Sequence, residues 1–167
     1  MTETPKKIIY VRGDATAPIG NGKKIIAHIC NDCVPGKWGA GFVLSLSRRW
    51  KEPEREYRAW SARWDPRKPY DLGEVQFVNA EDDIVVANMV AQHGVGSVGG
   101  VSPIRYDALK KCLEKVAVVA LEREASVHCP KIGSGLARGD WKTIEKIIDD
   151  ALASKGVGVT IYEFVRG

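Results

Sequence analysis

Short apolar runs rich in β-branched residues alternate along this chain with segments of helical periodicity, and this alternation constrains the fold more than any other feature. Residues 8–11 and 24–30 are nearly continuous apolar runs, as is typical of strands covered on both faces. Four more strands are predicted, over 74–79, 84–92, 127–132 and 157–165. Because only the polar turn at 80–83 separates the first two of these, they are expected to form a hairpin.

Segments with helical spacing separate the strands. The recurrence of Phe42, Leu46 and Trp50 predicts a helix over 39–50, and a basic helix is expected to follow over about 52–62. Two later helices are predicted to begin at recognisable N-terminal caps, which are Ser102 followed by Pro103, and Asp140.

Strands that alternate with helices, together with one hairpin, predict an α/β fold: a three-layer α/β/α sandwich with a mixed, mostly parallel central sheet. The 167 residues are expected to form a single domain, 1–167, because no linker divides the chain. In such sheets ligands gather beyond the carboxyl ends of the strands. The residues that follow predicted strands in this chain include Asp14, Asn31, Gln92 and the triplet Gly133-Ser134-Gly135.

Composition argues against several classes of protein. No apolar run approaches the roughly 20 residues of a membrane-spanning helix, and the first seven residues lack the apolar core of a secretory signal. Four cysteines without such a signal favour free thiols in a reducing compartment. A cytoplasmic protein without membrane contact is therefore expected. Cys30 and Cys33 lack the two further ligands that zinc needs, so no metal and no cofactor is predicted.

The formal net charge of +4 is concentrated in one window, 48–68, where eight basic residues stand against four acidic ones. Trp50, Trp60 and Trp64 are interleaved with these charges. Basic residues with aromatic neighbours can hold a polyanion, which predicts weak nucleic-acid binding. The favoured interpretation is an amphipathic helical segment with buried tryptophans and solvated charges, because the charges are mixed in sign.

Two glycine-rich segments lie between a predicted strand and a predicted helix, at 39–42 and 133–139. Glycines let the backbone turn with positive φ and expose successive N–H groups to an anion, and a helix N-terminus has unpaired amides for the same purpose. Two such loops in one sandwich suggest a diphosphate held from both sides. The alternative for each is a glycine that only permits a turn or close helix–sheet packing.

The order of these loops resembles a macrodomain, the ADP-ribose-binding module, and most nearly the subgroup of terminal ADP-ribose protein glycohydrolase. The resemblance covers residues 9 to 164. It is carried by Arg12-Gly13-Asp14, His28-Ile29-Cys30-Asn31-Asp32-Cys33, Gly39-Ala40-Gly41-Phe42, Pro130-Lys131-Ile132-Gly133-Ser134-Gly135-Leu136-Ala137-Arg138, and Trp141 with the closing Val159-Thr160-Ile161-Tyr162.

The resemblance implies a role for each segment. Asp14, with Ala15 beside it, is implied to accept a hydrogen bond from the adenine amino group. Asn31 and Asp32 are implied to lie near the distal ribose. The residues implied to hold the diphosphate, through backbone amides and the Ser134 hydroxyl, are Gly39, Ala40, Gly41, Phe42, Ile132, Gly133, Ser134, Gly135, Leu136, Ala137 and Arg138.

Two positions depart from the subgroup's pattern. The subgroup has a lysine that forms a covalent adduct with the opened ribose, and Gln92 occupies the matching position here. It also has an acidic residue after the Gly-Leu of the second phosphate loop, where this chain has Ala137. An amide cannot form a Schiff base and alanine cannot take a proton, so a lysyl-adduct mechanism is excluded.

Hydrolysis by a positioned water is the remaining catalytic hypothesis, with Asn31, Asp32, Gln92 and His93 as the candidate catalytic residues. Histidine is the side chain that most readily exchanges a proton near neutral pH. His28 and His128, by contrast, lie within predicted strands and are expected to be core histidines.

The leading hypothesis is a hydrolase that removes ADP-ribose from acidic side chains of modified proteins, deacetylates O-acetyl-ADP-ribose, or does both. Its expected partners are ADP-ribose and ADP-ribosylated protein. A non-catalytic reader of ADP-ribose and an ADP-ribose 1″-phosphate phosphatase are the alternatives.

Overall fold

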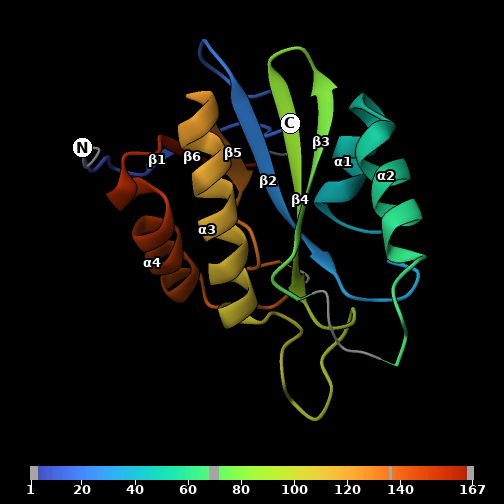
Figure 1. The fold of residues 1–167 in the computed structure, drawn as a ribbon. Helices are drawn as coiled ribbons and strands as arrows, with labels where there is room; N and C mark the ends of the chain where they lie inside the picture. The colour runs from blue at the N-terminus through green and yellow to red at the C-terminus, as the bar shows by residue number, and fades with distance from the viewer. Residues whose placement is uncertain (1–3, 68–71, 136, 165–167) are drawn as a thin grey trace.

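The computed structural model of the protein describes residues 4–67, 72–135 and 137–164. Strands and helices are interspersed along the chain, in pairs over the first half and singly toward the C-terminus (Figure 1). The strands are β1 (Ile9–Arg12), β2 (Lys24–Asn31), β3 (Val75–Glu81), β4 (Ile84–Gln92), β5 (Ser126–Pro130) and β6 (Val159–Glu163). The helices are α1 (Phe42–Arg49), α2 (Glu52–Ser61), α3 (Tyr106–Arg123) and α4 (Trp141–Ala151), followed by a short 3₁₀ turn, η1 (Ala153–Lys155).

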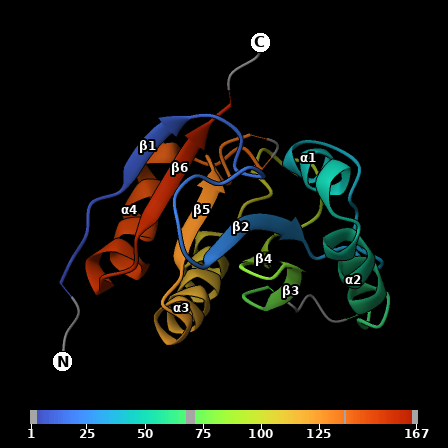
Figure 2. The same ribbon diagram turned by 90° about the horizontal axis from the view of Figure 1, so that it is seen from above.

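The six strands form one sheet in the order β1-β6-β5-β2-β4-β3. All neighbours are parallel except β3 and β4, which form the predicted antiparallel hairpin. Strands β2 and β4 are buried along nearly their whole length, which explains why both are continuous apolar runs. Figure 2 shows α3 and α4 on one side of the sheet and α1 and α2 on the other. The predicted three-layer sandwich is confirmed.

Each face of the sheet has its own hydrophobic core. On the α3 and α4 side, Leu109, Leu113, Ile144 and Ile148 are fully buried against the sheet. On the α1 and α2 side the core is aromatic and consists of Trp38, Trp50, Tyr57 and Trp64 around Leu46. The glycine-rich loop at 39–42 runs directly from one of these tryptophans into α1, so the second core fixes where that loop lies.

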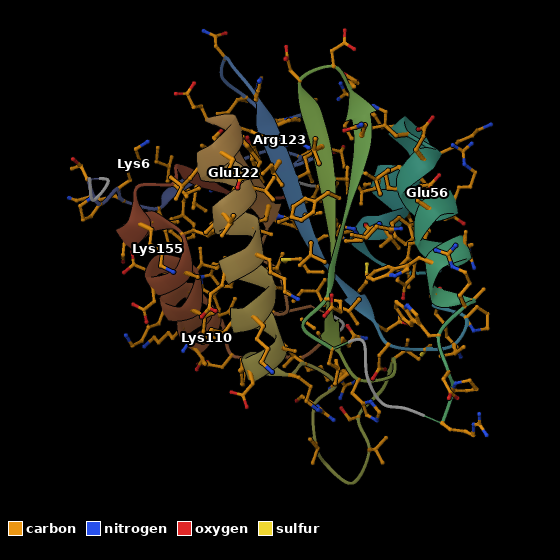
Figure 3. All side chains as sticks on the ribbon, in the orientation of Figure 1. Lys6, Glu56, Lys110, Glu122, Arg123 and Lys155 are labelled. Carbon is orange, nitrogen blue, oxygen red and sulfur yellow. The ribbon has the colours of Figure 1, made fainter. Side chains whose placement is uncertain are left out.

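The charges of 48–67 lie outside this aromatic core, as the favoured interpretation predicts, and Lys68 of that window lies outside the described residues. Figure 3 shows charged side chains such as Glu56 on α2 and Lys110 on α3 on the outer faces of the helices. Four basic residues of the window pair with carboxylates, in the pairs Arg58–Glu54, Arg55–Glu56, Arg67–Asp65 and Arg49–Glu81. This pairing supports solvated helix faces. Nucleic-acid binding stays a prediction, which the salt dependence of RNA binding would test.

The start of α3 was predicted wrongly. It begins at Tyr106 rather than after Ser102, because tertiary contacts hold the preceding residues in an extended conformation. The Pro103 carbonyl accepts from the His93 N–H, the Arg105 N–H bonds the carbonyl of Ala91, and Ile104 is buried with its N–H bonded to the carbonyl of Ala137. The cap predicted for α4 is confirmed, since Asp140 accepts bonds from the Thr143 N–H and hydroxyl.

His28 is part of a buried polar ladder that crosses three strands. Its register partner Asn88 on β4 accepts from the imidazole Nε2, and the Asn88 amide nitrogen donates to Gln76 on β3 and to the carbonyl of Pro53. Because these two bonds fix which way the amide of Asn88 points, the hydrogen of neutral His28 is on Nε2. Burial lowers the pKa of His28 to about 4, and burial also lowers the pKa of His128 to about 4.

These two histidines predict how stability depends on pH. An unfolded histidine binds a proton below about pH 6.5, whereas folded His28 and His128 do so only near pH 4. Between these values the unfolded state binds more protons, so the free energy of unfolding is expected to fall as the pH falls. The slope is up to about 1.4 kcal/mol per pH unit for each histidine. Urea unfolding at pH 7, 6 and 5 measures it, and an unchanged free energy between pH 7 and 5 would contradict the prediction.

Within the described residues, no helix is both long enough and apolar enough to cross a membrane. The same residues contain no group of three or more His, Cys, Asp or Glu side chains placed to hold a metal ion. The cysteines at 30, 33, 112 and 129 are all free thiols.

Candidate functional site

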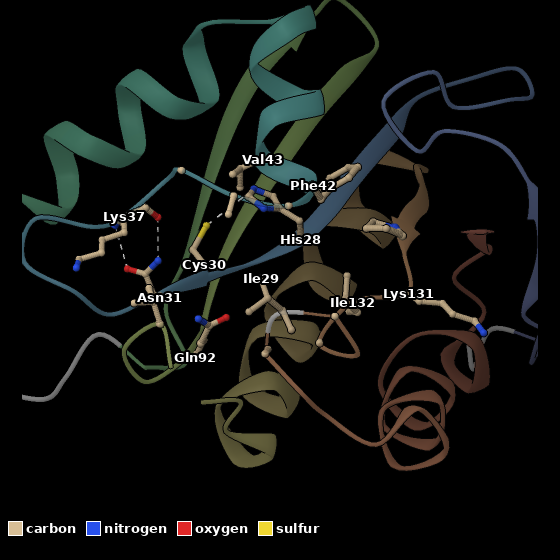
Figure 4. Close-up of a pocket in the computed structure, with 18 residues that line it drawn as sticks. His28, Ile29, Cys30, Asn31, Lys37, Phe42, Val43, Gln92, Lys131 and Ile132 are labelled. Atoms are coloured by element: carbon tan, nitrogen blue, oxygen red, sulfur yellow. Dashed lines mark hydrogen bonds between the residues drawn. The ribbon is translucent and has the colours of Figure 1, made fainter. Parts of the chain in front are cut away.

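A cavity of about 630 Å³ opens at the carboxyl ends of β2, β4 and β5. Figure 4 shows Phe42 and Val43 on one side of it and Gln92 and Ile132 on the other. The lining comes from four segments and consists of His28, Ile29, Cys30, Asn31, Lys37, Gly39, Ala40, Gly41, Phe42, Val43, Gln92, Val95, Pro130, Lys131, Ile132, Gly133, Gly135 and Ala137. The two glycine-rich segments singled out in the sequence therefore share one cavity.

The first of these segments ends in the N-terminus of α1. Gly41 is the N-cap, with a φ of 81° and no side-chain hydrogen bond to the helix. The amides of Phe42 and Val43 belong to the first turn, whose N–H groups have no partner within the helix, and both residues line the cavity. The cavity wall thus presents an uncapped helix N-terminus, which is a favourable place for an anion.

The second segment is a compact loop over a floor of isoleucines. Gly133 has a φ of 75°, and a Cβ built on it would lie 2.5 Å from Ile104 Cδ1 and 2.9 Å from Ile144 Cδ1. Arg138, at a φ of 55°, donates its N–H to the carbonyl of Gly135, and the Gly139 N–H bonds the carbonyl of Gly133. These contacts press the loop against the core and fix the direction of its amides.

Not every residue predicted for this loop lines the cavity. Ile132, Gly133, Gly135 and Ala137 do, whereas Ser134 and Arg138 do not. The Ser134 hydroxyl donates to the carbonyl of Lys131. Leu136 lies outside the described residues.

Asn31 closes the loop that leads from β2 toward α1. Its side-chain oxygen accepts from the N–H groups of Lys37 and Cys33, and its amide nitrogen donates to the carbonyl of Lys37 at 2.8 Å. The Tyr57 hydroxyl bonds the Asn31 backbone carbonyl at 2.6 Å. With these bonds made, one N–H of the Asn31 amide is left to meet a ligand.

Asp32 and His93 form a pair at the rim of the cavity, although 61 positions separate them in the sequence. The Asp32 carboxylate, which is 6% exposed, lies 2.7 Å from His93 Nδ1 and also accepts from the Gly94 N–H at 2.9 Å. The pair orients the imidazole with Nδ1 toward the carboxylate and leaves Nε2 as the other polar atom of a half-exposed ring. Neither Asp32 nor His93 is among the lining residues, but the nearby Asn31, Gln92 and Val95 are.

Gln92 contributes an amide where the resemblance would place a lysine. Its side-chain nitrogen donates to the carbonyl of Gly94 at 2.8 Å. This bond leaves the amide oxygen as an acceptor at the cavity wall. Ala137 is buried, with 5% of its surface exposed, so a carboxylate at this position would pay a large desolvation penalty.

Asp14 lies away from the cavity, at the carboxyl end of the edge strand β1. One of its carboxylate oxygens, Oδ1, accepts from both the N–H and the hydroxyl of Thr16, each at 2.8 Å, and Ala15 beside it is buried. Three strand spacings separate β1 from β2, which corresponds to about 14 Å. A ligand that touches both Asp14 and Asn31 is therefore the size of a dinucleotide.

Several residues that line the cavity were not predicted from the sequence. They are His28, Ile29, Cys30, Lys37, Val43, Val95, Pro130 and Lys131. His28 is confirmed as a buried histidine, yet it also forms part of the cavity wall. No local sequence pattern distinguishes a histidine buried in the core from one that also lines a cavity, because both depend on which segments cover the strand.

Comparison with known proteins begins with sequence. No family model matches the chain. It is 32% identical to the mouse (Mus musculus) protein Chromodomain-helicase-DNA-binding protein 1-like over 95% of its own length, but it spans only 18% of that relative. It is 24% identical to an ADP-ribose 1″-phosphate phosphatase of Lodderomyces elongisporus, with 84% of this chain and 89% of the relative covered.

Solved structures extend the comparison. A macrodomain protein from Streptomyces coelicolor is 49% identical, with a TM-score of 0.79, and 96% of this chain and all of that chain are covered. A protein of unknown function from Bacteroides thetaiotaomicron is 50% identical, with a TM-score of 0.88 and coverage of 95% and 98%. DarTG of Thermosipho africanus, solved in complex with ADP-ribose, shares the fold at 13% identity with a TM-score of 0.69, and the match covers 99% of this chain and 44% of that one.

Proposed function

The chain belongs to the macrodomain family, and from that premise we propose that its cavity binds ADP-ribose and that the protein hydrolyses an ester at the distal ribose. The observation that carries the proposal is the shared cavity between the uncapped N-terminus of α1 and the loop at Gly133. Backbone amides from both sides would hold the diphosphate there.

The charges around the cavity agree with an anionic ligand. Among the described residues, the charged side chains in its lining are Lys37 and Lys131, and none of these lining residues is a carboxylate. Lys131 is paired with Glu163 at 3.3 Å, so the amides and Lys37 would provide most of the attraction. The distal ribose would then lie near Asn31 and Gln92.

Asp14 supports the assignment of the purine end. Thr16 occupies Oδ1 of its carboxylate, which leaves Oδ2 to accept a hydrogen bond from the adenine amino group. The distance between β1 and β2 suits a molecule with adenosine at one end and a second ribose at the other. Two similar proteins, a phosphatase of ADP-ribose 1″-phosphate and a DarTG bound to ADP-ribose, agree with this ligand.

Ester hydrolysis would proceed through a water activated by His93. The imidazole Nε2 takes a proton from the water as the water oxygen attacks the ester carbonyl carbon, and Asp32 stabilises the resulting imidazolium through Nδ1. The bond between that carbon and the ribose oxygen then breaks, and the proton passes to the ribose oxygen. The products are ADP-ribose and a carboxylate, either the acidic side chain of a protein or acetate. Asn31 and Gln92 would place the distal ribose and the water.

Two assays test the proposal. Calorimetry is expected to give a micromolar dissociation constant for ADP-ribose, which corresponds to about −8 kcal/mol, and weaker binding of ADP. Incubation with glutamate-ADP-ribosylated protein and with O-acetyl-ADP-ribose is expected to release product above the spontaneous rate. Absence of ADP-ribose binding would overturn the whole proposal.

Binding without release would instead identify a non-catalytic reader of ADP-ribose. Phosphate released from ADP-ribose 1″-phosphate would favour the phosphatase, the activity named for the Lodderomyces elongisporus relative. Either outcome, found without release from the two esters, would contradict ester hydrolysis while leaving the ligand in place.

A further inference from the structure

The loop over residues 13–23 carries Asp14 and is held by a hydroxyl from another strand. In Figure 2 the chain leads from β1, at the edge of the sheet, past β6 and β5 to β2. The Tyr162 hydroxyl on β6 accepts from the Ile19 backbone N–H at 2.9 Å. Tyr162 is only 2% exposed, so this bond ties an otherwise peripheral loop to the interior of the protein.

A directed chain of hydrogen bonds lies behind Tyr162. Its hydroxyl is 2.7 Å from His128 Nδ1, and His128 Nε2 is 2.7 Å from the Ser126 hydroxyl. Burial lowers the pKa of His128, so the ring is neutral and has one hydrogen. The Tyr162 hydroxyl accepts from the loop and can donate its own hydrogen to Nδ1; in that tautomer the imidazole hydrogen on Nε2 goes to Ser126. The hydrogen bonds therefore connect the loop to Ser126 through Tyr162 and His128.

The segment between Gly13 and Ile19 is fixed at three places. The Gly13 N–H bonds the Glu163 carbonyl at 2.9 Å, the Arg49 guanidinium donates to the Thr16 carbonyl at 2.8 Å, and Tyr162 holds Ile19. Inside this segment the Ala17 N–H bonds the Asp14 carbonyl, and Thr16 bonds the Asp14 carboxylate. The direction of the second carboxylate oxygen consequently depends on where the segment is held.

We propose that Tyr162, backed by His128, is a positioning residue that aims the Asp14 carboxylate at the purine and so sets the preference for a 6-amino over a 6-oxo purine. A carboxylate accepts from the amino group of adenine and is repelled by the carbonyl oxygen of hypoxanthine. The discrimination requires that the carboxylate oxygen face the edge of the base. This inference rests on the proposed function for the identity of the ligand.

The test compares the affinity for ADP-ribose with that for its hypoxanthine analogue, inosine diphosphate ribose. The wild-type protein is expected to prefer ADP-ribose, and Asp14→Asn is expected to lose that preference. Tyr162→Phe removes one oxygen atom and is expected to lower the preference on the order of tenfold. In the Asp14→Asn background the same change is expected to have no further effect on the preference, because Tyr162 acts through Asp14. Tyr10→Phe, which alters a hydroxyl bonded to Glu145 on α4, is the matched control and should retain the preference.

A second variant removes the same bond from the loop side. Ile19 has a largely exposed side chain, and Ile19→Pro deletes the N–H that Tyr162 accepts without changing the core. It is expected to lower the purine preference as Tyr162→Phe does. A preference that survives both variants overturns the inference alone. A wild-type protein that binds ADP-ribose without preferring it overturns both the purine assignment and the inference, and failure to bind ADP-ribose at all overturns the proposed function.

Discussion

Replacing Gly133 by valine is expected to weaken ADP-ribose binding at least about 100-fold and to lower the free energy of unfolding by roughly 2–5 kcal/mol. The φ of 75° is unfavourable for a β-branched residue. The new side chain would also overlap Ile104 and Ile144, since even its Cβ would lie 2.5 and 2.9 Å from their terminal methyl groups. The loop must therefore move, and its amides with it. Urea unfolding and calorimetry measure the two effects.

Gly135→Ala is the matched control in the same loop. A Cβ on Gly135 meets no described atom within 4 Å, and its backbone is outside the left-handed region. Its stability is expected to stay within about 0.5 kcal/mol of wild type. Gly133→Ala offers a milder version of the main change if the valine variant does not fold. Wild-type affinity in a folded Gly133 variant would show that this loop does not hold the ligand.

His93→Ala is expected to reduce ester hydrolysis about 100-fold or more and to leave the dissociation constant of ADP-ribose unchanged. The imidazole lies at the rim and does not line the cavity, so its removal takes away a proton acceptor and not a binding contact. Asp32→Asn is expected to act in the same direction, because it removes the charge that stabilises the imidazolium.

Asp140→Asn is the control for this second prediction. Asp140 is an exposed carboxylate that caps α4, and hydrogen bonds from Thr143 lower its pKa. Asparagine is an equally good helix cap, so the hydrolysis rate should not change. Hydrolysis at the wild-type rate by His93→Ala would remove this residue from the mechanism and leave Gln92 and Asn31 to orient the water.

The architecture was predictable because its signals are local. Strands β2 and β4 are apolar along their length since helices cover both of their faces, and the turn of the hairpin is short and polar. The predicted start of α3 was wrong because contacts between segments far apart in the sequence decide where this helix begins. Ser102 and Pro103 form a good local start signal, but the burial of Ile104 and the backbone bonds of Pro103 to His93 and of Arg105 to Ala91 hold this stretch extended.

The candidate site was predictable only in part. The glycines of both loops could be identified because a backbone with positive φ and a helix start without a side-chain cap both favour glycine in the sequence. The pairing of Asp32 with His93 has no signal in the sequence, since it depends on the bulge at the end of β2 and the return of the chain after β4. The isoleucine floor under Gly133 combines Ile29 of β2, Ile104 before α3 and Ile144 of α4, and it is visible only once the sheet is assembled.

Helix α1 connects the two regions of the protein that would contact the two ends of the proposed ligand. Its first residues line the cavity, and its last residue, Arg49, donates a hydrogen bond to the segment that carries Asp14. Eight residues of helix make a stiff strut about 12 Å long. The helix therefore fixes the position of one end of the proposed site relative to the other. A molecule that contacts both ends of the site would meet a surface that is already ordered at both places. The two halves of that molecule, added as separate fragments, would each contact only one end of the helix.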